Sequence, residues 1–106
     1  MFSNNEQILS RIKQSINLLD ANADIILYGS RARKDATPDS DWDVLILIDK
    51  ETVTLEDENF YRHPLYDIEL ETGEIISLLL YSKKEWENKL WITPLYKNIK
   101  KEGVKL

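Results

Sequence analysis

Apolar residues near the N-terminus recur at three- and four-residue intervals. The apolar positions are Ile8, Leu9, Ile12, Ile16 and Leu19. This is the period of a helix that buries one face. Ser3 and Glu6 have the spacing of a capping box, which marks the start of a helix. The pattern therefore predicts a first helix from Ser3 to about Asp20.

Two compact apolar runs follow and are typical of buried strands. The first run covers residues 25–28. The second covers residues 42–48 and is nearly continuous after Asp43, as in a strand that is covered on both faces. Between them, Gly29 and Ser30 break the first run. Residues 31–36 fit a short helix, and residues 37–40 have the composition of a turn.

The middle of the chain has a different pattern. Residues 49–59 are acidic and predict a loop with one helical turn, because Thr54 and Asp57 have capping spacing. Residues 65–72 alternate between apolar and charged or polar side chains, which indicates a half-exposed strand. Residues 72–74 contain Gly73 and predict a hairpin turn into another buried strand over residues 75–81.

Helix signals return in the C-terminal part. Ser82 and Glu85 form a second capping-box pattern, and Thr93 before Pro94 is typical of an N-cap and first helical position. The last helix is expected to end near Gly103. Together these elements predict a single domain over residues 1–106 with the order α-β-α-β-loop-β-β-α-α. The fold class is α/β (α+β), a small mixed β-sheet flanked by helices.

Composition narrows the function classes. The chain has 106 residues, of which 42% are hydrophobic and 31% are charged, with a net charge of −5. Such an acidic chain is a poor candidate for binding nucleic acid, which requires clustered Lys and Arg. There is no cysteine, so thiolate metal sites are excluded. The sequence has no signal-peptide pattern and no membrane-length apolar stretch, and we expect a cytoplasmic protein without a membrane partner.

The candidate chemistry lies around the second strand. Asp41 and Asp43 flank Trp42, and residues two apart in a strand point to the same face. The two carboxylates are therefore expected to project together. Paired carboxylates suit Mg²⁺ or Mn²⁺, which bind through one or two carboxylates and the phosphates of a substrate.

A second group of residues lies at the preceding turn. Gly29 lets a ligand approach the backbone, Ser30 adds a hydroxyl, and N–H groups at the start of a helix favour an anion. Arg31, Arg33 and Lys34 add three cations within four positions. We therefore predict a metal-chelated nucleoside triphosphate, attacked in line by the hydroxyl of an acceptor. The alternative is that each motif alone is ordinary turn chemistry.

The two stretches that carry this pattern resemble one known superfamily. They read Leu27-Tyr28-Gly29-Ser30-Arg31-Ala32-Arg33 and Asp39-Ser40-Asp41-Trp42-Asp43-Val44-Leu45. They are similar to the minimal nucleotidyltransferases of the DNA polymerase beta-like superfamily. The resemblance implies that superfamily's fold and Mg²⁺-dependent transfer of a nucleoside monophosphate, usually AMP from ATP. It also implies that Gly29 and Ser30 contact the triphosphate, and that Asp41 and Asp43 are metal ligands.

The same resemblance suggests a partner and shows two departures. Minimal members often act beside a helical HEPN-type protein in toxin–antitoxin pairs. The family commonly has glycine where this chain has Lys34, which is either a phosphate contact or a solvated surface residue. The family also expects a third carboxylate, as general base or metal support, where this chain has Ser77. The candidate substitutes, each of which is also consistent with an exposed acidic face, are Glu69, Glu71 and Glu74.

Two hypotheses follow from these observations. The first is an enzyme that adenylylates a partner protein, with the acceptor surface supplied by that partner or by a second copy. The second is a catalytically degenerate module that neutralises a HEPN-type partner by contact alone. Antibiotic modification is a third class, disfavoured because this length leaves no room for an acceptor-binding domain.

Overall fold

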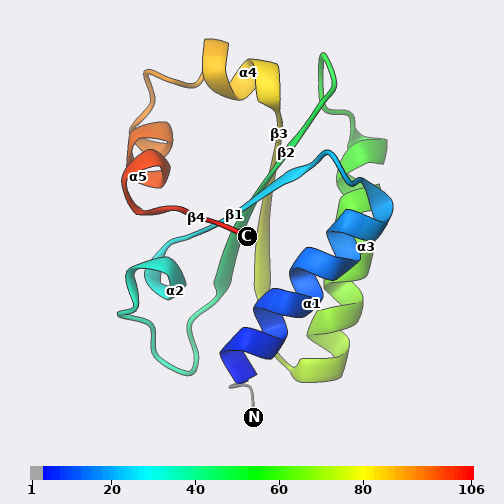
Figure 1. The fold of residues 1–106 in the computed structure, drawn as a ribbon, viewed down its shortest axis with the longest axis vertical. Coiled ribbons are helices and arrows are strands. Elements are labelled where there is room, and N and C mark those ends of the chain that lie inside the picture. The colour runs from blue at the N-terminus through cyan, green and yellow to red at the C-terminus, as the bar shows by residue number, and fades with distance from the viewer. Residues whose placement is uncertain (1–3) are drawn as a thin grey trace.

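The computed structural model describes residues 4–106, and the predicted Ser3 cap lies outside that range. In chain order the elements are α1 (Asn4–Leu19), β1 (Asp24–Tyr28), α2 (Ser30–Arg33), β2 (Trp42–Ile48), α3 (Leu55–Thr72), β3 (Ile76–Ser82), α4 (Lys83–Asn88), α5 (Pro94–Glu102) and β4 (Val104–Lys105) (Figure 1). None of the described helices is long and apolar enough to cross a membrane.

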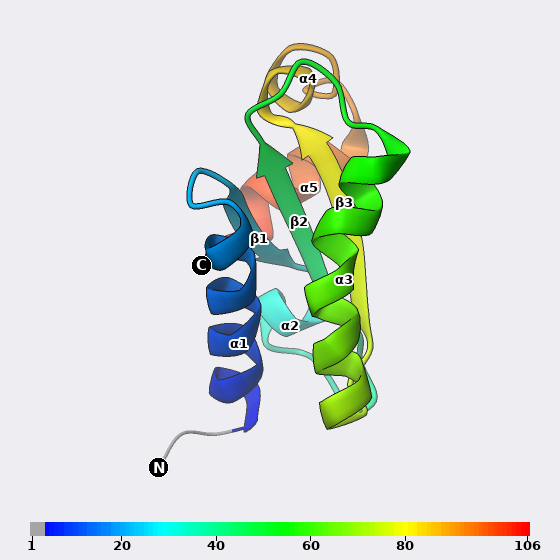
Figure 2. The same ribbon diagram turned by 90° about the vertical axis from the view of Figure 1, so that its right-hand side faces the viewer.

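The strands form one mixed sheet in the order β3-β2-β1-β4. β1 runs antiparallel to both β2 and β4, whereas β2 and β3 are parallel. Helices α1 and α3 cover one face of this sheet, and α4 and α5 lie on the other side (Figures 1 and 2). The predicted class, a small mixed sheet flanked by helices, is confirmed.

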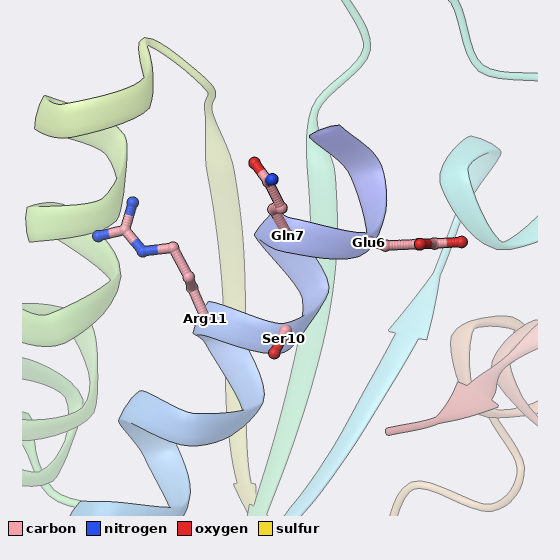
Figure 3. A pocket seen from close by; sticks show the side chains of 4 residues that line it. All are labelled: Glu6, Gln7, Ser10 and Arg11. Atoms are coloured by element: carbon pink, nitrogen blue, oxygen red, sulfur yellow. The ribbon is translucent and has the colours of Figure 1, made fainter. Parts of the chain in front are cut away.

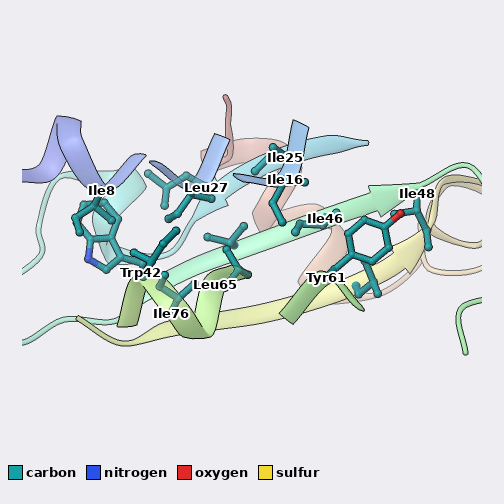
Figure 4. Close-up of a cluster of buried hydrophobic side chains, with 14 residues drawn as sticks. Ile8, Ile16, Ile25, Leu27, Trp42, Ile46, Ile48, Tyr61, Leu65 and Ile76 are labelled. Atoms are coloured by element: carbon teal, nitrogen blue, oxygen red, sulfur yellow. The ribbon is translucent and has the colours of Figure 1, made fainter. Parts of the chain in front are cut away.

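Strand β2 lies inside the sheet, and its side chains contribute to two hydrophobic cores. Trp42, Val44 and Ile46 belong to the larger core, which α1 and α3 complete (Figure 4). Leu45 and Leu47 point to the opposite face, where they pack with residues of α4 and α5. The run of apolar residues thus buries both faces of β2, as predicted. Asp43, which is only half-buried, shares the α4–α5 face with Leu45 because strand residues alternate.

The predicted strand over residues 65–72 is wrong, because these residues form the second half of helix α3. Tyr61, Leu65 and Ile68 are the buried residues of this helix, at spacings of four and three. Tyr66 and Leu70, which the alternating pattern would have buried with Ile68, are exposed. The helix continues through Pro64. Packing against α1 and the sheet outweighs the loss of one backbone hydrogen bond at that proline.

The predicted hairpin at residues 72–74 is also wrong. Gly73 ends α3 in the left-handed conformation (φ 77°), and its N–H donates to Glu69 O at 2.8 Å. Helix α3 therefore carries the chain from β2 to the parallel strand β3, a connection that parallel strands require. The short strand β4 was not predicted. Caps were more reliable, since Thr54, Ser82 and Thr93 each accept the backbone N–H three residues later.

Candidate active site

The turn after β1 lies directly against the carboxylate of Asp43. Tyr28 is the cross-strand partner of Asp43, so Gly29 follows at the same level of the sheet. Gly29 has φ 74° and ψ −159°, a combination that is essentially restricted to glycine. A Cβ atom at position 29 would lie 2.3 Å from Asp43 Oδ2. The backbone conformation and the close approach both require glycine here.

Asp41 and Asp43 share one side of β2. The intervening Trp42 is buried on the α1–α3 face. Burial raises the pKa of Asp43, and the negative charge of Asp41 raises it further. Arg33 opposes this effect, and the carboxylate of Glu102 adds to it. The two aspartates are therefore close enough to repel each other, which a cation between them would relieve.

Ser77 lies beside this pair. It is the parallel partner of Asp43 in the β2–β3 ladder, and its Oγ is 3.5 Å from Asp41 Oδ2. A serine hydroxyl is neither a good ligand for a divalent metal nor a base at neutral pH. The strand position nearest to the two carboxylates thus adds no third negative charge.

The three candidate substitutes for a third carboxylate have other partners. Glu69 accepts the N–H of Ile76 at 3.1 Å, and Glu74 accepts the indole N–H of Trp42 at 3.1 Å. Glu71 is paired with Arg11 of α1. Their positions differ from the prediction, because Glu69 and Glu71 belong to helix α3 rather than to a neighbouring strand, and Glu74 follows the C-cap of that helix. Over residues 4–106, no cluster of three or more His, Cys, Asp or Glu could hold a metal.

Arg31 supports the loop that leads to Asp41. Its side chain is only 7% exposed, and its guanidinium stacks 4.3 Å from the centre of the Trp42 ring. The same group donates to Ser40 O at 2.9 Å and to Pro38 O at 3.3 Å. Arg31 was predicted as a nucleotide contact, but these contacts give its charge a structural role.

Arg33 is more accessible and faces the carboxylates. It donates to Asp35 at 3.1 Å and to Glu102 at 2.9 Å, and its charge lowers the pKa of Asp43. Glu102, at the end of α5, was not identified from the sequence. Its position depends on β4 pairing with β1, and a two-residue strand leaves no pattern in the sequence.

Lys34 stands where the family commonly has glycine, and its backbone conformation shows why glycine suits this position. The helix α2 ends there, earlier than predicted, and Lys34 adopts φ 65° and ψ 26° while its N–H donates to Ser30 O. It is the one non-glycine residue with positive φ between residues 4 and 106. A left-handed conformation costs a residue with a Cβ roughly 1–2 kcal/mol, whereas glycine adopts it freely.

We expect Lys34→Gly to stabilise the protein. Relief of the left-handed conformation exceeds the added freedom of glycine in the unfolded chain, for a net gain of about 0.5–1 kcal/mol. Urea unfolding at equilibrium measures the difference. Lys34→Ala, which keeps the Cβ and removes the charge, is the control. If the alanine variant is stabilised equally, charge rather than backbone conformation is the cause.

Tyr28 is a further neighbour of the carboxylates. Burial raises its pKa to about 12, with contributions from the charge of Asp43 and from Tyr81. Its hydroxyl therefore stays protonated at neutral pH and remains a hydrogen-bond donor. Its position beside Asp43 follows from the antiparallel register of β1 and β2.

A hollow of about 400 Å³ lies elsewhere, along α1 (Figure 3). Its lining includes Glu6, Gln7, Ser10 and Arg11, and Arg11 extends toward α3, where it pairs with Glu71. Among the described residues, none of the predicted site residues lines it. The hollow is therefore separate from the carboxylate site.

The chain was also compared with models of known protein families. The model of the nucleotidyltransferase domain matches residues 7–106, nearly the whole chain. The chain belongs to the nucleotidyltransferase domain family. It is thus a member of the DNA polymerase beta-like nucleotidyltransferase superfamily, and the mixed sheet with flanking helices agrees with that fold. A search of curated proteins finds no match.

The residues of this nucleotidyltransferase domain fit the divalent metal and nucleoside triphosphate that its family typically uses. Asp41 and Asp43 offer hard oxygen ligands on one face, and burial together with the charge of Asp41 raises the pKa of Asp43 although Arg33 is nearby. Mg²⁺ is commonly held by two carboxylates that leave its other positions to phosphates and water. The donor set therefore suits one cation shared with a bound triphosphate.

Proposed function

We propose that this domain transfers a nucleoside monophosphate, AMP from ATP, to a hydroxyl of a partner protein, with Mg²⁺ or Mn²⁺. One observation carries the proposal. The carboxylate of Asp43 is packed against the glycine-only backbone of Gly29, with Asp41 beside it. A structural scaffold has no need for two repelling carboxylates beside a turn whose conformation only glycine adopts, and backbone of this kind collects at functional sites.

Each residue has a role in this proposal. Asp41 and Asp43 hold the cation, which supplies charge stabilisation to the phosphates during the transfer. Gly29 and Ser30 contact the outer phosphates, and Arg33 and Lys34 are the exposed cations beside them. The acceptor hydroxyl oxygen bonds to the α-phosphorus as the bond to the β-phosphate oxygen breaks and pyrophosphate leaves. The hydroxyl proton passes to water, because Ser77 beside the two aspartates is not a base.

The acceptor surface is proposed to come from a helical HEPN-type protein or from a second copy of this chain. The support is the resemblance to minimal nucleotidyltransferases, which often act beside such a partner. We propose a cytoplasmic setting, where ATP and Mg²⁺ are both supplied.

A second candidate, neutralisation of a HEPN-type partner by contact alone, is favoured by a specific observation. Ser77 stands beside the two aspartates, and the nearby carboxylates of Glu69, Glu71 and Glu74 are bonded elsewhere. Without a base, the transfer would be slow, since general base catalysis contributes about 100- to 10,000-fold.

Labelled ATP separates the two candidates. With the cognate partner present, label at the α-phosphate is expected to appear on the partner protein, and label at the γ-phosphate is not. Asp41→Asn is expected to abolish this labelling while the complex still forms. If wild type leaves no label on the partner but still neutralises it, transfer is excluded and the contact mechanism holds.

A further inference from the structure

The position of Asp41 depends on its sequence neighbours, whereas that of Asp43 is set by the sheet. Asp43 lies within β2, and strands β1 and β3 pair with it on both sides. Asp41 precedes β2 and is exposed. A metal ligand is oriented by the groups that surround it, so a ligand in a loop requires contacts that hold the loop. The contacts of Ser40 and Trp42 therefore determine where the Asp41 carboxylate lies.

Arg31 holds the peptide that enters Asp41. Its guanidinium donates to Ser40 O twice, from Nη2 at 2.9 Å and from Nε at 3.3 Å. Nη2 also donates to Pro38 O at 3.3 Å. The carbonyl of Ser40 and the N–H of Asp41 belong to one planar peptide unit. Because the guanidinium is a rigid fork, two donors on one carbonyl oxygen fix the orientation of this peptide.

The peptide that leaves Asp41 is held as well. It includes the N–H of Trp42, which donates to Ile75 O at 2.8 Å. The indole N–H of Trp42 donates to Glu74 Oε2 at 3.1 Å, and its ring belongs to the larger core. Asp41 is thus fixed from both sides, by Arg31 before it and by residues 74–75 after it.

One carboxylate oxygen connects these two supports. Oε2 of Glu74 accepts the indole N–H of Trp42 and lies 3.7 Å from Nη2 of Arg31. Arg31 in turn stacks on the Trp42 ring, so the three side chains contact one another in pairs. The side chain of Glu74 is only 30% exposed and that of Arg31 is nearly buried. Solvent and salt therefore screen this ion pair less than a pair on the open surface.

The end of helix α3 fixes Glu74 itself. Gly73 is the left-handed C-cap of this helix, and the N–H of Glu74 donates to Thr72 Oγ1 at 3.2 Å. The next residue, Ile75, is bonded to the backbone of Trp42. The backbone of Glu74 is therefore held on both sides, which places its carboxylate in a defined position.

We propose that Glu74 is a positioning residue for the metal site, which acts through Arg31 and Trp42 to hold Asp41 beside Asp43. This inference rests on the proposed nucleotide site. In this role Glu74 contacts neither the metal nor the phosphates, so it does not replace the third carboxylate that the family has at the position of Ser77. Loss of such an outer contact typically lowers metal affinity or activity by about 10- to 100-fold.

Calorimetric titration with ATP and Mg²⁺ tests this role. Glu74→Ala removes both contacts of the carboxylate, and its Mg²⁺-dependent affinity for ATP is expected to fall by about 10- to 100-fold. Glu74→Gln is expected to bind more weakly than wild type and more tightly than Glu74→Ala. Its amide oxygen still accepts the indole N–H but carries no charge for Arg31.

The direction of the change separates positioning from simple charge. Removal of a negative charge near a bound triphosphate would by itself tighten binding, because like charges repel. Positioning predicts weaker binding. The Mg²⁺ concentration that gives half of the ATP binding should also rise in Glu74→Ala, which a loss of stability alone would not produce in a folded variant.

Glu71→Ala is the matched control for this variant. Glu71 lies three positions earlier, in the last turn of α3, and pairs with Arg11 of α1 instead of the residues beside Asp41. It removes the same type of side chain from the same end of the helix. Glu71→Ala is therefore expected to bind ATP as wild type does and to require the same Mg²⁺ concentration.

A double-mutant cycle tests whether Glu74 acts through Arg31. Arg31→Lys keeps the charge but lacks the fork that holds Ser40 O, so it is expected to weaken ATP binding as well. Combined with Glu74→Gln, the total loss should be smaller than the product of the two single losses, because both changes break one connection. Fully independent losses overturn the proposal.

The same titrations distinguish failure of this inference from failure of the proposed function. If Glu74→Ala binds ATP as wild type does, or if Glu74→Gln binds more tightly than wild type, the positioning role is overturned and the nucleotide site stands. If wild type binds no ATP in the presence of Mg²⁺, the proposed function and the positioning role are both overturned.

Discussion

Gly29→Ala is expected to remove Mg²⁺-dependent nucleotide binding. The new methyl group would lie 2.3 Å from Asp43 Oδ2, so the carboxylate or the turn has to move. A displacement of about 1 Å in a catalytic group costs roughly 100-fold in rate. The backbone at φ 74° and ψ −159° adds a stability cost of about 1–3 kcal/mol. Calorimetric titration with ATP and urea unfolding measure the two effects.

Gly73→Ala is the matched control for this variant. Gly73 also has positive φ (77°), but a Cβ there meets no atom within 4 Å. The control should lose about 1 kcal/mol of stability, as alanine does in the left-handed region, and keep its nucleotide affinity. If both variants lose binding equally, general destabilisation is the cause. If neither loses binding, the contact between Gly29 and Asp43 has no part in the site.

Asp43→Asn is expected to abolish nucleotide transfer while stabilising the metal-free protein. Loss of the carboxylate removes a metal ligand, and metal charge stabilisation is worth several kcal/mol, so transfer should fall by about 100-fold or more. The free energy of unfolding of the metal-free protein should increase. Burial and the charge of Asp41 raise the pKa of Asp43, so the folded state disfavours the charged carboxylate.

The pH dependence of this effect has a definite sign. Because the pKa of Asp43 is raised in the folded state, its carboxyl stays protonated to a higher pH in the folded state than in the unfolded state. Its contribution to stability therefore falls as pH rises from its ordinary, unfolded pKa of about 3.8 through the higher folded value. In the presence of EDTA, Asp43→Asn should unfold at higher urea than wild type at neutral pH, and the difference should shrink near pH 4.

Asp49→Asn is the control for charge removal, because Asp49 is exposed and follows the far end of β2. It should leave both transfer and the pH dependence unchanged. An Asp43→Asn protein that is less stable than wild type at neutral pH would show that the carboxylate makes a stabilising contact, contrary to this account.

The centre of the fold could be predicted because its signals are local. The apolar run of β2 is bounded by turn residues, and the observed strand has the predicted limits of Trp42 and Ile48. The common side of Asp41 and Asp43 follows from strand alternation about the buried Trp42. The N-caps Ser82 and Thr93 depend on contacts three residues away, and they were also identified correctly.

The second half of helix α3 could not be assigned from the sequence, because its apolar residues fit both the two-residue period of a strand and the longer period of a helix. Ile68 is buried in either pattern, and only packing against α1 and the sheet decides that Tyr66 and Leu70 face solvent. Pro64 lies inside this helix, although proline usually interrupts one. The error carried over to Glu69 and Glu71, which were considered as strand carboxylates near the site and belong to this helix.

The partners of charged side chains were outside the reach of sequence patterns. Arg31 was grouped with Arg33 and Lys34 because the three lie within four positions of sequence, yet only the folded structure places Arg31 against the Trp42 ring. Glu102 joins the site through a contact with Arg33 across 69 positions of sequence. Such long-range ion pairs leave no periodic or local pattern.

The central claim is that Gly29, Ser30, Asp41 and Asp43 form a metal-dependent nucleotide site, and calorimetric titration with ATP tests it most directly. Wild type is expected to bind one ATP per chain in the presence of Mg²⁺ and to lose that binding in EDTA. Asp43→Asn should show no Mg²⁺-dependent binding, and Asp49→Asn should bind as wild type does. Absence of binding by wild type with any nucleoside triphosphate and Mg²⁺ or Mn²⁺ would contradict the claim.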